Sequence, residues 1–148
     1  MTKKVEFLYP PHTDQSLVKK IKSNYKEVFD KCDNSAGGFI HDFDERSAFD
    51  VSIGKRNEFY EKKWGERGFG FWLGSFNDIM IDERANETAA EFARDKIRAR
   101  VQDPTVANLL APTDHPFGSK RVPLESGYYE SYNRDNVKLV DLKKTPVK

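Results

Sequence analysis

The chain has 148 residues, the length of one domain, and only 37% of them are hydrophobic, so its core is thin or shared with another surface. Its 25 Lys and Arg nearly balance its 24 Asp and Glu, which argues against a nucleic-acid partner. No apolar run has the length of a membrane span or of a signal peptide, and the single cysteine cannot form an internal disulfide. We therefore expect a cytoplasmic protein without a membrane partner.

The first predicted helix follows a pair of prolines. Apolar side chains recur at helical spacing over residues 17–32, and Thr13 or Asp14 is suited to cap the start of the helix. The sequence Asn-Ser-Ala-Gly-Gly at 34–38 is typical of a helix end. This pattern predicts one amphipathic helix with a buried apolar stripe. Cys32 lies on that stripe, so we interpret it as a core residue rather than a nucleophile.

The middle of the chain combines a second predicted helix with an aromatic, glycine-rich segment. Residues 55–66 have helical periodicity and place Phe59, Tyr60 and Trp64 where they can pack together. In the sequence GFGFWLGSF at 68–76, glycines alternate with large aromatic residues, which favours close backbone approach over a regular helix. Its glycine spacing and its bulky side chains do not match a dinucleotide-binding loop. We therefore predict a packing turn.

The clearest helix signal begins at Asp82. Residues 82–101 are rich in Ala, Glu and Arg, with acidic residues first and basic residues last, as the helix dipole favours. Asp103 and Pro104 provide a cap and a first-turn proline for a short helix that continues to Leu110. The sequence thus predicts two consecutive helices in this part of the chain.

The C-terminal part contains the candidate functional residues. Residues 112–127 carry closely spaced prolines and glycines without periodicity, as functional loops often do. Within them, Lys120 and Arg121 could bind a phosphate and a second anion, although most basic pairs in loops are only solvated. Residues 137–142 predict a short strand. The histidines match no metal-site spacing, so no metal is expected.

The sequence KRVPLESGYYESYNRDNVKLVDLKKTP, residues 120–146, resembles the segment that follows the helical insertion in Baeyer-Villiger monooxygenases of the cyclohexanone monooxygenase type. Other sequences upstream resemble the same family in the same order: NSAGGF at 34–39, GFGFWLGSFNDIMID at 68–82 and ERANETAAEFARDKI at 83–97. The resemblance covers nearly the whole chain. So many elements in one order are far more specific than a single short motif.

This resemblance implies an FAD- and NADPH-dependent monooxygenase that inserts an oxygen atom next to a ketone to give an ester or a lactone, with a ketone or a sulfide as substrate. Position by position, Arg121 would be the catalytic residue, stabilising negative charge on the flavin and on the reacting oxygen. Lys120 would bind NADP through its 2′-phosphate or its ribose. Val122 and Glu125 depart from the family, which usually has proline and aspartate there.

The resemblance also implies a mainly α fold. Residues 1–111 would be the helical insertion of a flavoprotein with two dinucleotide-binding domains, and residues 112–148 would be the active-site loop with the start of a returning edge strand. Both dinucleotide-binding fingerprints, and the family motif with a histidine and Trp-Pro, are missing from this sequence. We therefore expect an incomplete domain, a fragment that is inactive alone and that pairs with the missing FAD and NADP domains.

Two alternatives to such a fragment remain open. The chain could be a standalone helical binding module that presents Phe69, Phe71, Trp72 and Phe76 to a partner. It could also be a nonfunctional remnant of the enzyme. A longer reading frame upstream that encodes the flavin fingerprint would favour the fragment.

Overall fold

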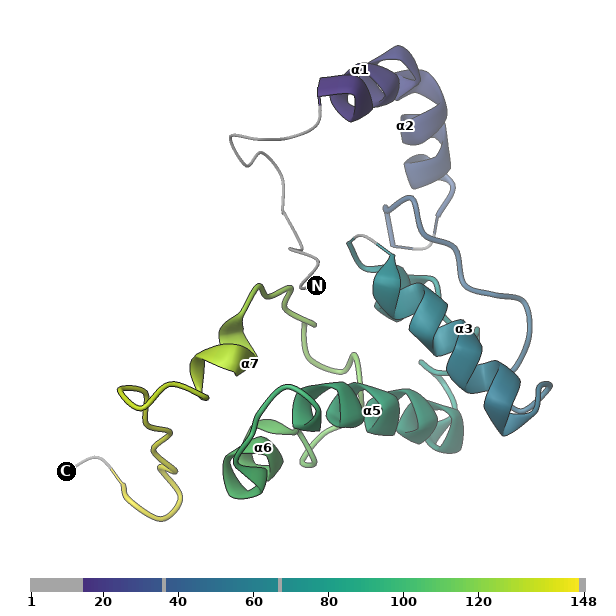
Figure 1. The fold of residues 1–148 in the computed structure, drawn as a ribbon. Coiled ribbons are helices and arrows are strands. Elements are labelled where there is room, and N and C mark those ends of the chain that lie inside the picture. Colours follow the sequence, from purple (N-terminus) through teal and green to yellow (C-terminus); the bar gives the residue numbers. More distant parts are fainter. Residues whose placement is uncertain (1–14, 36, 67, 147–148) are drawn as a thin grey trace.

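The computed structural model describes residues 15–35, 37–66 and 68–146, and Figure 1 shows their arrangement. Within these ranges the helices are α1 (Gln15–Ser23), α2 (Tyr25–Asp33), α3 (Ile53–Gly65), α4 (Gly70–Leu73), α5 (Glu83–Arg98), α6 (Pro104–Leu110) and α7 (Tyr128–Ser131). The same residues contain no strand, only an isolated parallel β-bridge between Asp44 and Phe76. The predicted mainly α fold is confirmed. Among the described residues, no helix combines the length and the apolar character that crossing a membrane requires.

The helix predicted over residues 17–32 is in fact two helices, α1 and α2, which separate at Asn24. The Ser23 hydroxyl donates a hydrogen bond back to a carbonyl oxygen of its own helix at 2.9 Å, and the Asn24 backbone (φ −117°, ψ 22°) leaves the helical region. Serine and asparagine favour such interruptions because their side chains compete for backbone hydrogen bonds. The candidate caps Thr13 and Asp14 lie outside the described residues.

The apolar stripe of α1 and α2 is exposed, contrary to the prediction. Ile21 is 43% exposed and Phe29 is 59% exposed, α2 has no buried residue, and Cys32 is only half-buried. Figure 1 shows the two helices apart from α5 and α6, and they pack mainly on each other. The interpretation of Cys32 as a core residue is therefore wrong, because an amphipathic face is buried only where another element packs against it.

The core is aromatic and lies between α3, α4 and α5. Tyr60 is completely buried, and its ring centroid lies 5.4 Å from that of Phe71, 5.5 Å from that of Phe76 and 5.4 Å from that of Phe92. Trp64 packs edge-on against Phe71 at 5.2 Å. Edge-to-face pairs of this kind add to the stabilisation from apolar burial. Tyr60 and Trp64, predicted to pack together with Phe59, thus share one core, in which these ring contacts are to residues of other segments.

The segment 68–76 packs closely, as predicted, but it also contains a helical turn, α4, that its glycines did not predict. Phe71 and Phe76 are only 7% and 0% exposed. A Cβ atom on Gly74 would lie 2.8 Å from the carbonyl oxygen of Gly70, too close for any side chain. Since Phe71 and Phe76 belong to the core, the exposed aromatic surface expected of a binding module is not formed by them.

Helices α5 and α6 begin where the sequence predicts. The Asp82 carboxylate accepts a hydrogen bond from the backbone N–H of Ala85 at 2.8 Å, and the Asp103 carboxylate accepts one from Thr105 at 2.7 Å. Pro104 occupies the first turn of α6. Side-chain capping therefore defines both helix starts. The two helices pack against each other.

The strand predicted over residues 137–142 is not formed. These residues are irregular, and Val140 and Leu142 are each 59% exposed. A strand needs a neighbour to complete its hydrogen bonds, and no described segment pairs with this one. The short helix α7 was not predicted, and it follows Gly127, whose φ of 76° lies in the left-handed region that glycine favours.

Asp44 provides a test of the fold by pH. Its carboxylate accepts hydrogen bonds from Arg46 Nε at 2.7 Å and Nη2 at 2.8 Å, and these bonds lower the pKa of Asp44 to about 2. Because this pKa lies below the usual 3.8, the stabilisation is complete above about pH 4 and is lost as the pH falls through about 2. In the Asp44→Asn variant we expect this part of the acid destabilisation to vanish. The change in the free energy of unfolding should be small, because solvent screens the pair.

Urea unfolding of the two proteins between about pH 5 and about pH 2 measures this difference. The gap between their free energies of unfolding should narrow toward acid. Parallel pH profiles for the two proteins would show that the ion pair of Asp44 contributes nothing measurable.

Candidate active-site loop

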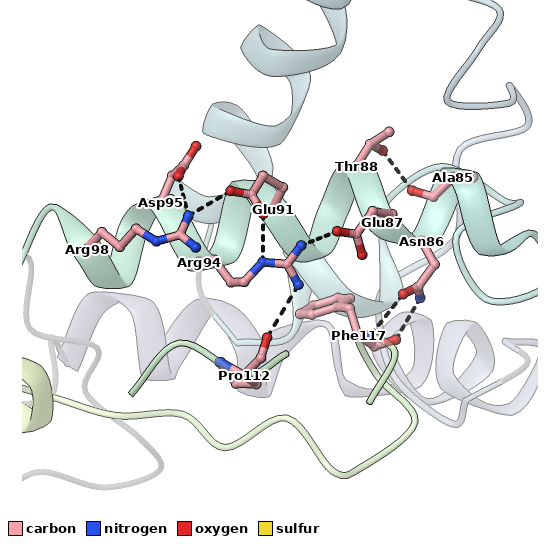
Figure 2. Close-up of polar contacts among 10 residues, drawn as sticks. All are labelled: Ala85, Asn86, Glu87, Thr88, Glu91, Arg94, Asp95, Arg98, Pro112 and Phe117. Carbon is pink, nitrogen blue, oxygen red and sulfur yellow. Dashed lines mark hydrogen bonds and ion pairs between the residues drawn. The ribbon is translucent and has the colours of Figure 1, made fainter. Parts of the chain in front are cut away.

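Residues 112–127, called here the candidate loop, are held at their start by Arg94 of α5. The Arg94 side chain is buried, forms an ion pair with Glu87 and donates a hydrogen bond to Glu91 at 2.7 Å. It also donates to the carbonyl oxygen of Pro112 at 3.3 Å, as Figure 2 shows. A buried guanidinium is stable only when its charge and its N–H groups are matched in this way. Arg94 thus fixes where the candidate loop leaves α6.

The middle of the candidate loop is held by Asn86, another buried polar residue of α5. Its side chain exchanges two hydrogen bonds with the backbone of Phe117, both 2.8 Å long, and Figure 2 shows this pairing. It donates a third to the carbonyl oxygen of Ile79 at 2.7 Å. The Phe117 ring enters the aromatic core, 5.2 Å from Phe71. The backbone is therefore fixed a few residues before Lys120.

Gly118 turns the chain from this fixed point toward the surface. Its φ is 79°, and a Cβ atom at this position would lie 2.7 Å from Trp72 Nε1 and 3.2 Å from Met80 Sδ. Both the left-handed backbone and the lack of space exclude a larger residue without rearrangement. The chain can thus pass close over Trp72 before it reaches Lys120.

The end of the candidate loop is held by Arg100, which follows α5. Its guanidinium donates to both carboxylate oxygens of Glu130, from Nε at 2.7 Å and from Nη2 at 2.6 Å, and Nη1 binds Glu125. It also lies 5.1 Å from the centre of the Tyr129 ring. The hydrogen bonds to Glu130 and the one to Glu125 raise the pKa of Arg100, and the hydrogen bonds from Arg100 lower the pKa of Glu130.

Asn133 extends this attachment. Its side chain donates to the carbonyl oxygen of Arg100 and accepts from the N–H of Gln102, each at 2.8 Å. The Tyr128 N–H donates to the Glu125 carboxylate, also at 2.8 Å. Through these contacts the segment after the candidate loop is attached to the residues that follow α5.

Lys120 and Arg121 lie between the fixed points, and both are exposed. Arg121 forms no hydrogen bond or ion pair with the described residues. It lines an open hollow of ≈ 400 Å³. The residues around this hollow are Phe69, Arg121, Val122, Pro123, Leu124, Glu125 and Ser126. The structure thus places a guanidinium with free donors at the edge of a concave surface.

Lys120 has a different electrostatic environment. Its charge contributes to lowering the pKa of the neighbouring Asp114, although the main cause is the hydrogen bond between Asp114 and His115, which is 2.6 Å long. No group of three or more His, Cys, Asp or Glu among the described residues could hold a metal ion. The cations offered by this loop therefore fit an anion or a phosphate, with Arg121 as a planar donor and Lys120 as a compact charge.

Asn86 should couple the stability of the chain to the order of the candidate loop. Replacing Asn86 by alanine leaves the Phe117 N–H, which it had bonded, without a partner, and we expect a loss of about 1–3 kcal/mol in the free energy of unfolding. Hydrogen exchange at the Phe117 amide should accelerate. Urea unfolding and exchange followed by mass spectrometry measure the two effects. Asn108→Ala is the matched control, because Asn108 is exposed. Equal exchange rates at Phe117 in both variants would show that Asn86 does not hold the loop.

Comparison with known proteins yields no matching family model, but it yields several related enzymes. Cyclopentanone 1,2-monooxygenase from Comamonas is 42% identical over 130 residues, which are 86% of this chain and 24% of that enzyme. A Baeyer-Villiger monooxygenase from Pseudooceanicola batsensis is 37% identical over 136 residues, 90% of this chain and 24% of that enzyme. In structure, the chain matches OTEMO in complex with FAD and NADP with a TM-score of 0.88 at 40% identity, covering 90% of this chain and 25% of that one.

The chain is homologous to Baeyer-Villiger monooxygenases. It spans about a quarter of the length of the relatives that it matches. The family resemblance stated from the sequence is therefore confirmed, and FAD and NADP are the cofactors present in a structural neighbour from this Baeyer-Villiger group.

Asn86, Arg94 and Arg100 position the candidate loop, and none of them was among the site residues predicted from the sequence. A signal was present for the first two, because Asn86 and Arg94 interrupt the apolar face of a helix that otherwise buries alanines and Ile97. Polar residues in such positions are normally hydrogen-bonded to something specific. The partners, however, lie in segments far away in sequence.

Proposed function

We propose that this chain supplies the helical insertion and the active-site loop of an FAD- and NADPH-dependent Baeyer-Villiger monooxygenase. Residues 1–111 form the insertion and residues 112–148 carry the loop. The reaction inserts an oxygen atom next to a ketone to give an ester or a lactone, and sulfides are a second substrate class. The observation that carries the proposal is the unpaired Arg121 beside Lys120, presented at an open hollow in a fold close to that of an FAD- and NADP-bound enzyme.

The two cations have different roles in this proposal. FAD, when bound, supplies the oxygen-transfer chemistry. Arg121 is the catalytic residue, and its fixed positive charge stabilises negative charge on the flavin and on the reacting oxygen. Lys120 binds NADP through the 2′-phosphate or the ribose, for which a compact ammonium is suited. No other cation of the candidate loop is available for these tasks, because Lys120 and Arg121 are its only basic residues besides His115.

The isolated chain is proposed to be inactive and to need the FAD and NADP domains of such an enzyme as partners. Its exposed apolar side chains support this, since Ile81 is 86% exposed and Ile53 is 69% exposed. Apolar side chains as exposed as these are buried when a partner surface packs on them. A standalone binding module is less well supported, because Phe71 and Phe76 are buried. The cytoplasm stays the predicted location.

The experiment is a chimera in which this chain replaces the homologous quarter of cyclopentanone 1,2-monooxygenase from Comamonas. We expect the chimera to bind FAD and to form lactone from cyclopentanone with NADPH, as followed by gas chromatography. A second chimera, in cyclohexanone 1,2-monooxygenase from Acinetobacter, separates misfolding of one host from a missing activity.

The isolated chain is measured beside the chimeras by flavin fluorescence and product analysis. Tight FAD binding and lactone formation by the chain alone would refute its proposed dependence on the other domains. Two chimeras that bind FAD but form no lactone would refute the proposed role in oxygen insertion.

A further inference from the structure

Glu125 lines the same hollow as Arg121, yet its carboxylate is bound by a different arginine, Arg100. One oxygen forms the ion pair with Arg100, and the other accepts the N–H of Tyr128 at 2.8 Å. The carboxylate is three-quarters buried, with a side-chain exposure of 24%. Both of its oxygens are therefore engaged, and neither is bound to Arg121.

Arg100 is well suited to hold this carboxylate in place. Its own guanidinium is oriented by the two hydrogen bonds to Glu130, because a paired contact between a guanidinium and a carboxylate fixes the plane of both groups. The Tyr129 ring packs on it at 5.1 Å. Asn133 binds the Arg100 backbone. Arg100 thus has little freedom to release Glu125.

If Glu125 were not bound, its carboxylate would attract the Arg121 guanidinium in the same hollow. An arginine paired within its own chain offers fewer donors and less net charge to a ligand. We propose that Arg100 is a positioning residue that keeps Arg121 available to an anion by sequestering Glu125. This inference rests on the proposed function only in assuming that an anion is what Arg121 binds.

A purely structural role for Arg100 makes a different prediction from this one. If Arg100 only anchors the loop, its removal disorders the loop and removal of Glu125 as well cannot repair it. If Arg100 sequesters Glu125, then Arg100→Gln frees a carboxylate that makes Arg121 less available to an anion, and adding Glu125→Gln restores that availability. The direction of the change caused by Glu125→Gln therefore separates the two explanations.

The test on the isolated chain is the rate at which phenylglyoxal modifies Arg121, followed by peptide mass spectrometry. The reagent attacks the unprotonated guanidine, which a bound carboxylate disfavours. We expect modification of Arg121 to slow about two- to fivefold in Arg100→Gln, the range that an exposed ion pair gives. In the double variant, the rate of Arg121 modification should return to that of the protein without substitutions. Arg98→Gln is the matched control, since the partners of Arg98 are Glu91 and Asp95 of α5 and Asn108 of α6, and it binds no described residue of the candidate loop.

An unchanged or increased rate at Arg121 in Arg100→Gln would overturn the inference, and so would a double variant as slow as the single one. Lactone formation by the same variants in the chimera provides a second readout, with kcat falling in the single variant and recovering in the double. Because the phenylglyoxal rates need neither FAD nor NADPH, they can support the inference even if the chimera is inactive. In that outcome it is the proposed function that fails.

Discussion

Replacing Arg121 by alanine in the chimera is expected to lower kcat for lactone formation by about 100-fold or more, which is the effect of removing one preorganised donor from a developing anion. The side chain is exposed and forms no hydrogen bond or ion pair with the part of the chain that the structure describes, so the free energy of unfolding should not change. FAD should still bind. Steady-state kinetics, with flavin absorbance to count active sites, measures the effect. A loss of less than about tenfold would mean that Arg121 does not stabilise the reacting oxygen.

Two further variants sharpen this prediction. Lys120→Ala should raise KM for NADPH while kcat is largely kept, because its proposed partner is the cofactor phosphate. Arg121→Lys keeps the charge but loses the planar pair of donors, so its activity should lie between those of the arginine and alanine proteins. Lys143→Ala is the control for loss of surface charge, since Lys143 is exposed and lies outside the candidate loop. Equal kinetic losses in the Lys120 and Lys143 variants would remove Lys120 from the NADP site.

The parts of the fold that sequence predicted well are those decided by local physics. Asp82 and Asp103 cap the helices that follow them, and Pro104 occupies a position where its missing N–H costs nothing. The predictions that Phe29 is buried and that residues 137–142 form a strand failed, because each depends on a partner surface that local sequence does not specify. An apolar stripe shows that a helix can be buried, and only the packing shows whether it is.

In the candidate site, too, features of the local sequence were found and contacts between distant positions were not. Lys120 and Arg121 stood out in the sequence as a basic pair, but their roles came from the family resemblance, because two adjacent cations in a loop carry little information by themselves. The contacts that hold them join Asn86 to Phe117 and Arg100 to Glu125, across 31 and 25 positions of sequence. Pairings at such separations cannot be read from periodicity. The departure at Glu125 was visible in the sequence, but its partner Arg100 became apparent only in the structure.

Replacing Tyr60 by alanine is expected to give the largest loss of stability in this chain. Tyr60 is completely buried, and its ring contacts those of Phe71 and Phe76 in the segment 68–76 and that of Phe92 in α5. Removing it leaves a cavity that these rings cannot fill without moving, and large-to-small changes of this kind cost about 3–5 kcal/mol. Urea unfolding followed by far-UV circular dichroism measures the change in the free energy of unfolding.

Tyr60→Phe is the matched control for this prediction, since it keeps the ring and removes only the hydroxyl that bonds Thr88 Oγ1 at 2.7 Å. It should cost about 1 kcal/mol, because Thr88 keeps a second hydrogen bond to the carbonyl oxygen of Ala85. Tyr60→Ala should also affect the candidate loop. Phe117 packs on Phe71, so a collapse of the core around position 60 also loosens the backbone that leads to Lys120. If the alanine and phenylalanine variants lost the same stability, the aromatic core between α3, α4 and α5 would not be what holds this chain together.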